Sequence, residues 1–202
     1  MSTAPSRLAK VLPWLLLIGG AIGLICSFVI SLDKQKLAQN PSFRPNCDLN
    51  PIVSCFNVMK SHQGSVFGFS NPWIGLAAFA ALMTVAVALL AGGRFKRWFW
   101  QGLEAGMVFG MVFAYWLLYE SVYTIRALCP YCLVVDVVVT TMFWYTTLYL
   151  AEQHMLPAAG GARATKAVAW SRQHHLDLLL LWFLIVIFFV VKHFWYYFGS
   201  HL

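Results

Sequence analysis

Charged side chains are scarce in this sequence, and acidic ones most of all. Only 10% of the 202 residues are charged, and seven are Asp or Glu. Soluble domains ordinarily carry about a quarter charged residues, so the composition excludes an ordinary water-soluble fold. Apolar residues fill the gap: 60% of the chain is hydrophobic and the mean hydropathy is +0.70. The chain is therefore expected to be embedded in a lipid bilayer.

Five apolar blocks reach or approach the roughly 20 residues that a helix needs to cross the hydrocarbon core. Each is predicted to be helical, because a helix satisfies its own backbone hydrogen bonds in lipid. The expected fold is an all-α membrane protein forming a single domain over residues 1–202. Four helices form a bundle around the functional site, a fifth follows, and an outward loop, 32–71, carries a short helix. The predicted spans are residues 11–31, 72–92, 98–119, 128–150 and 176–198.

The first block is not a typical signal peptide. It is longer than the apolar core of a signal peptide and has no small-residue cleavage motif, so we expect a retained anchor. The polar stretch at 157–172 is predicted to be a loop between the fourth and fifth spans.

The net charge of +7 does not indicate a nucleic-acid partner, because the basic residues gather near the ends of the predicted spans. Lys and Arg are enriched in the cytoplasmic loops of membrane proteins. The N-terminal tail, the 93–97 turn and the 151–175 loop share one side, which is therefore predicted to be cytoplasmic. The 32–71 loop and the 120–127 turn then face outward. The basic residues on the cytoplasmic side are Arg7, Lys10, Arg94, Lys96, Arg97, Arg163, Lys166 and Arg172.

Cysteines are also few, but four of the five fall on the predicted outward side, where disulfides persist. Cys26 is alone inside the first span and is expected to be a small packing residue. Cys129 and Cys132 form a C-x-x-C motif at the start of the fourth span, with Pro130 at the favoured first helical position. The positive end of the helix dipole lowers the pKa of a thiol at such a place. This motif therefore indicates redox chemistry.

Cys47 and Cys55 are the second pair. In one straight helix they would lie about 12 Å apart along the axis, too far for a disulfide. Asn50 and Pro51 are a good N-cap and a good first helical residue, so a short helix is predicted from Pro51 with Cys47 on a mobile approach. The alternatives are a static disulfide and a four-thiolate zinc site, which this spacing and an oxidising location disfavour.

These motifs together resemble the vitamin K epoxide reductase family, over roughly residues 11–150. The quinone-linked DsbB proteins carry the two kinds of cysteine pair in the opposite order. The resemblance rests on the C-x-x-C motif, on CDLNPIVSC at 47–55, on Val58 and Met59, on GSVFGF at 64–69 and on NPWIG at 71–75.

The resemblance implies a relay of thiol–disulfide exchanges. A reduced thioredoxin-like partner attacks a Cys47–Cys55 disulfide at Cys55, and the released Cys47 attacks Cys129 of a Cys129–Cys132 disulfide. Cys132 is then freed beside a quinone, which is reduced to quinol. The relay is expected to need neither a metal nor a flavin.

The resemblance also implies residues that bind the quinone. Asn71 matches an asparagine that hydrogen-bonds a quinone carbonyl, although it is equally placed to cap the second span before Pro72. Asp136 lies one turn beyond Cys132 on the same helix face. Vertebrate members carry a tyrosine there, and a carboxyl could instead donate a proton to the reduced ring. An ionisable group at that depth indicates function, and an interhelical hydrogen bond is the alternative. The ring pocket is expected to include Ser65, Phe67, Trp73 and Tyr131, although aromatic residues near helix ends also serve as interfacial anchors.

Many bacterial members carry a fused thioredoxin-like domain after the fifth span, and this sequence ends at Leu202. The expected donor is therefore a separate exported DsbA-like protein, and the expected setting is the bacterial cytoplasmic membrane. Similarity to actinobacterial members favours menaquinone over ubiquinone. Two rival functions stay open: an epoxide or quinone reductase that uses the same relay, and a membrane assembly factor with purely structural disulfides.

Overall fold

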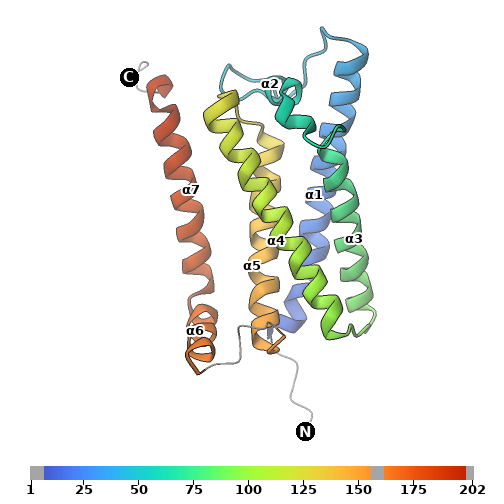
Figure 1. Cartoon of the computed structure of the whole chain (residues 1–202), viewed down its shortest axis with the longest axis vertical. Coiled ribbons are helices and arrows are strands. Elements are labelled where there is room, and N and C mark those ends of the chain that lie inside the picture. Colours follow the sequence, from blue (N-terminus) through green and yellow to red (C-terminus); the bar gives the residue numbers. More distant parts are fainter. Residues whose placement is uncertain (1–6, 156–161, 199–202) are drawn as a thin grey trace. The chain divides into compact units, whose positions relative to one another are not determined.

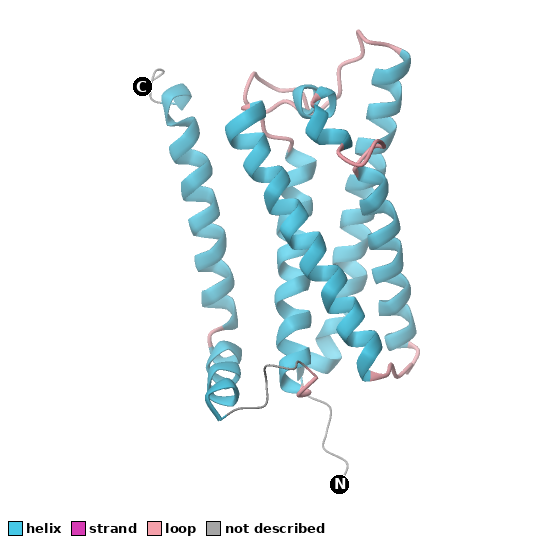
Figure 2. Cartoon of the chain, viewed as in Figure 1, coloured by secondary structure: helices cyan, strands magenta, loops and turns pink. Residues whose placement is uncertain are grey.

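A computed structural model of the chain describes residues 7–155 and 162–198, and these residues are all-helical apart from turns and loops (Figures 1 and 2). Five helices are long and apolar enough to cross a membrane. The predicted fold class is thereby confirmed. These helices are α1 (Arg7–Gln39), α3 (Pro72–Leu90), α4 (Arg97–Glu120), α5 (Pro130–Glu152) and α7 (His175–Phe198).

The chain divides into two compact units, Met1–Tyr149 and Leu150–Leu202. The first holds the bundle of α1, α3, α4 and most of α5. The second holds α6 (Ala162–Gln173) and α7. The prediction of a loop over 157–172 is wrong from Ala162 onward, because four alanines in the α6 segment give it high helix propensity. Residues 156–161 lie outside the described part of the chain.

The first helix is longer than predicted. It continues to Gln39 instead of ending at residue 31, since the added segment contains good helix formers such as Lys36 and Leu37. This extension packs against the loop that carries Cys47 and Cys55, called the redox loop below. Its Leu37, together with Ile30 earlier in α1, shares one buried cluster with Cys47, Cys55 and Cys129. The C-terminal end of α1 is therefore part of the wall around the cysteines.

Helices α1 and α3 are the most closely packed pair in the bundle. Glycines make this possible, as in many membrane helix pairs. A Cβ at Gly23 would lie 2.4 Å from atoms of the Phe79 ring, and one at Gly75 would lie 2.4 Å from Ser27 Oγ.

Polar contacts join α4 to α5. Tyr115 and Thr140 share a hydrogen bond of 3.0 Å between their hydroxyls, and the Thr147 hydroxyl donates to the buried Glu104 carboxylate. Such interhelical hydrogen bonds satisfy polar groups that lipid cannot.

Two short helices lie in the loop before α3: α2 (Cys55–Lys60) and the 3₁₀ turn η1 (His62–Ser65). The expectation that the first begins at Pro51 with Asn50 as its cap is wrong. Asn50 Oδ1 instead accepts from the N–H groups of Ile52 and Val53, which forms a side-chain turn. Ser54 is the N-cap, with its hydroxyl accepting from Asn57 N at 3.3 Å.

Candidate active site

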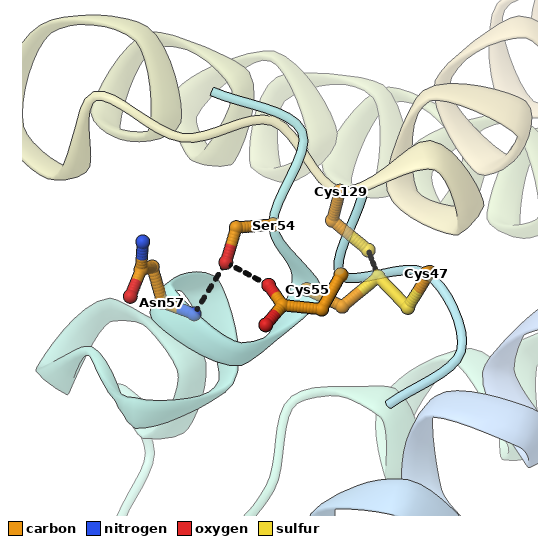
Figure 3. Close-up of a disulfide and its surroundings, with 6 residues drawn as sticks. Cys47, Ser54, Cys55, Asn57 and Cys129 are labelled. Carbon is orange, nitrogen blue, oxygen red and sulfur yellow. Dashed lines mark hydrogen bonds between the residues drawn. A yellow bond between two sulfur atoms is a disulfide. The ribbon is translucent and has the colours of Figure 1, made fainter. Parts of the chain in front are cut away.

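A disulfide joins Cys47 to Cys55, with their Cα atoms 5.7 Å apart (Figure 3). The chain makes this closure because the turn at Asn50 reverses its direction between the two cysteines. Both cysteines are buried, and Cys55 is fully so. In this structure two of the four sulfurs are bonded to each other, whereas a four-thiolate zinc site requires four free thiolates.

The loop disulfide lies directly against the C-x-x-C motif. Cys55 Sγ is 3.4 Å from Cys129 Sγ (Figure 3). Two backbone hydrogen bonds fix this approach, from Ser54 N to Leu128 O at 3.0 Å and from Leu128 N to Ile52 O at 2.6 Å. The predicted relay has Cys47 attacking Cys129, whereas the sulfur that the backbone brings to Cys129 is that of Cys55.

Cys129 and Cys132 are both free thiols, and Cys129 immediately precedes the start of α5 at Pro130. A hydrogen bond from the Cys132 thiol lowers the pKa of Cys129. Burial opposes this shift in pKa, while the N–H groups of Cys132 and Tyr131 add to it. The helix start therefore favours a Cys129 thiolate, as the sequence pattern predicts.

A cavity of about 380 Å³ lies within the four-helix bundle. Both C-x-x-C cysteines line it, together with Asn71 and Asp136, and most of the other lining side chains are apolar. Its size suits a small apolar ligand, since ligand pockets range from about 300 to 1,000 Å³. The geometry thus combines a reactive dithiol with a hydrophobic chamber.

The sequence model of one protein family matches residues 14–147, well over half of the 202-residue chain, and that interval contains every predicted site residue. The chain belongs to the vitamin K epoxide reductase family. Members of this family are thiol:quinone oxidoreductases, so this protein is a multi-pass membrane enzyme that exchanges electrons between thiols and a quinone. No curated protein matches the chain in sequence.

In this vitamin K epoxide reductase homologue the Asn71 side chain does not cap α3. Asn71 Oδ1 accepts from Val66 N at 3.2 Å, and Nδ2 donates to Gln63 O at 2.6 Å. An amide nitrogen carries two N–H groups, so one remains for a ligand in the cavity. Asn71 therefore both closes the loop and faces the chamber.

Asp136 lies on α5 one turn after Cys132, and both side chains line the cavity. Its backbone carbonyl accepts from the Thr140 hydroxyl at 2.7 Å. Cys132 and Asp136 therefore lie on the same face of α5, as their spacing in the sequence predicts, and a carboxyl group lines the cavity together with the dithiol.

Four residues were predicted to surround the quinone ring, and none of them lines the cavity: Ser65, Phe67, Trp73 and Tyr131. Ser65 accepts a hydrogen bond from Lys34, and Phe67 is half exposed, with its ring tilted against that of Phe113. Trp73 is 61% exposed on the bundle surface, and Tyr131 packs against the cysteine cluster. Ser65 and Phe67 therefore reach the cavity indirectly, through Lys34 and Phe113.

Lys34 is the cavity residue that the sequence reasoning missed. The first span was expected to end at residue 31, which placed Lys34 in the outward loop, whereas the structure places it in α1. The signal was its spacing: Lys34 follows Ile30 by four positions and precedes Leu37 by three, which places it between two buried residues on one helix face.

Proposed function

We propose that this enzyme reoxidises an exported DsbA-like or thioredoxin-like protein and passes the electrons to a membrane quinone, thereby supporting disulfide formation outside a bacterial cytoplasmic membrane. One observation carries the proposal. The loop disulfide reaches Cys129 through Cys55, and the C-x-x-C motif in turn borders the cavity. This arrangement offers a continuous sulfur path from a loop to a quinone-sized chamber.

Three balanced exchanges make up the relay. The partner dithiol reduces the Cys47–Cys55 disulfide and becomes a disulfide itself. The loop dithiol then reduces a Cys129–Cys132 disulfide, with Cys55 as the attacking sulfur because it lies 3.4 Å from Cys129. Finally the C-x-x-C dithiol gives two electrons and two protons to the quinone and closes again as a disulfide.

The partner is proposed to attack Cys47 rather than Cys55. Cys55 is fully buried and faces Cys129, whereas Cys47 retains 7% exposure and lies two positions before the loop residue Leu49, which is 72% exposed. Attack at Cys47 also releases Cys55 as the thiolate on the inner side. The loop must still open for the partner to reach the sulfur.

Asn71, at the start of α3, and Asp136, on α5, are proposed to hold the quinone ring in the cavity. Asp136 is also proposed to exchange a proton with the quinone. Menaquinone is preferred to ubiquinone by similarity to actinobacterial family members. Ser65 is proposed to act through Lys34, and Phe67, Trp73 and Tyr131 remain predictions from the family resemblance.

The proposed orientation places the N-terminus in the cytoplasm and both cysteine pairs outside. In Figure 1 the start of α1 lies at the opposite end of the bundle from α2. The basic turn before α4 lies at the same end of the bundle as the start of α1 (Figure 1), and the positive-inside rule supports this orientation.

The test is quinol formation by purified protein from a reduced DsbA-like donor and menaquinone. Turnover should fall below detection in Cys129→Ser and Cys132→Ser, while Cys26→Ser, which removes a buried thiol outside the relay, retains it. Full activity without Cys132 would refute the proposal. Vitamin K epoxide is assayed in parallel, and turnover of the epoxide in preference to the quinone would favour the reductase alternative.

A further inference from the structure

Lys34 is a cation at the outer end of the cavity. Its amine donates to Gly64 O and to Ser65 Oγ, each at 2.6 Å, and the side chain is half-buried among the cavity lining. An ammonium group has three N–H donors. Two are used by these contacts, so the third is left for a group inside the chamber.

The amine lies next to Asn71. Gly64 O accepts from both Lys34 Nζ and, at 3.2 Å, from Asn71 N, so the two donors lie within two hydrogen-bond lengths of each other. Gly64 permits this approach, because a Cβ there would lie 3.0 Å from Val58 O and 3.2 Å from the Lys34 amine. Lys34 and Asn71 therefore line the cavity on either side of one backbone carbonyl, that of Gly64.

Lys34 has no acidic counter-ion among the described residues. The ion pairs of these residues involve Lys36, Arg172 and His174 instead. A partly buried cation without a partner is costly, and a neutral donor such as glutamine could hold Gly64 and Ser65 equally well. A lysine at this place indicates a need for charge as well as for hydrogen bonds.

We propose that Lys34 stabilises the negative charge that develops on the quinone oxygen nearest Asn71 as the substrate accepts electrons. This inference rests on the proposed quinone site. In the step concerned, the dithiol of Cys129 and Cys132 becomes a disulfide, and the quinone gains two electrons and two protons to become quinol. Lys34 keeps its proton throughout and supplies a fixed positive charge, which is most effective in a site shielded from water.

Two half-reactions separate this role from that of a simple clamp. The first is quinol formation when quinone is mixed with fully reduced enzyme, and the second is reduction of the loop disulfide by a DsbA-like donor without quinone. Lys34→Gln should slow the first about tenfold or more and leave the second unchanged, and Lys34→Arg should restore most of the rate. Lys36→Gln removes a charge from the exposed side of the same helix and should change neither.

Equal slowing of both half-reactions by Lys34→Gln would make Lys34 a clamp and overturn the proposal, as would an unaffected quinone step. Failure of the wild type to form quinol at all would instead refute the proposed function. The two failures are therefore distinguishable.

A binding measurement on the unaltered protein covers the case in which Lys34→Gln does not fold. The probes are a hydroxynaphthoquinone that is ionised at neutral pH and its neutral methyl ether, which have nearly the same shape. The reduced wild-type enzyme should bind the anion about tenfold more tightly than the ether. Equal binding, or preference for the ether, would overturn the role of Lys34 while leaving the quinone site intact.

Discussion

At the scale of single residues, Cys129 is buried, yet its surroundings favour the thiolate form of its side chain. The hydrogen bond from Cys132 is the largest cause of its lowered pKa. Because a thiol with a lowered pKa stays ionised below the usual range, its reactivity should persist at pH values where an ordinary cysteine is protonated, and be lost only as the pH falls through the lowered pKa.

Alkylation of reduced protein across a pH series, with Cys129 followed by mass spectrometry, measures this directly. Replacing the hydrogen-bond donor in Cys132→Ala should move the midpoint of the Cys129 rate to higher pH. The solvent-facing Leu49→Cys variant supplies an ordinary thiol as the reference. A midpoint that Cys132→Ala leaves in place would contradict the assigned cause.

Asp136 carries the second residue-scale prediction. If its carboxyl exchanges a proton with the quinone, Asp136→Asn should lower the rate of quinol formation about 100-fold, the usual range for a lost general acid or base. Asp136→Glu should recover part of it. Thiol exchange with the donor should be unaffected, because Cys47 and Cys55 lie in the loop outside the cavity lining. Slower exchange in Asp136→Asn would indicate a structural role instead.

The placement of the chemically distinctive residues was largely predictable, because the four cysteines and Asp136 are identified by type and spacing; their roles stay predictions. Which loop sulfur faces Cys129 was not predictable. That choice depends on the backbone pairing of residues 52–54 with Leu128, a contact between segments far apart in the sequence. Lys34 was missed for the related reason that its position depends on where α1 ends.

At the scale of elements, glycine decides how near α1 comes to α3. Gly23→Ala should destabilise the protein by about 1–3 kcal/mol, because the new methyl group would collide with the Phe79 ring. Gly102→Ala in α4 is the matched control: its Cβ would meet no atom within 4 Å, so the usual helical gain of alanine over glycine should make it neutral or slightly stabilising. Thermal unfolding in detergent compares the two. Equal stability of both variants would mean that the helices separate readily.

Apolar run length predicted the five spans well, since lipid thickness sets the length of a spanning helix. Element boundaries in water-facing segments were less predictable. The end of α1, the start of α2 and the whole of α6 depend on propensity, side-chain turns and tertiary contact rather than on hydrophobicity.

At the scale of the whole molecule, the proposed function depends on which side of the membrane holds the cysteines. The exposed position 49 lies in the redox loop, and the exposed position 91 lies in the turn after α3, so they mark opposite ends of the bundle. In a protein without native cysteines, Leu49→Cys should react with a membrane-impermeant maleimide on intact cells. Ala91→Cys should react only after the membrane is disrupted.

The reverse labelling pattern would place both cysteine pairs in the reducing cytoplasm, where disulfides do not persist. The relay would then have no exported dithiol partner from which to take electrons, and its use would be to supply reduced quinone rather than to oxidise exported proteins. Orientation therefore discriminates between the proposed function and the reductase alternative, since both would use the same cavity and the same four sulfurs. Labelling of both positions on intact cells would show leaky membranes, so a cytoplasmic marker protein with an exposed cysteine must stay unlabelled in the same sample.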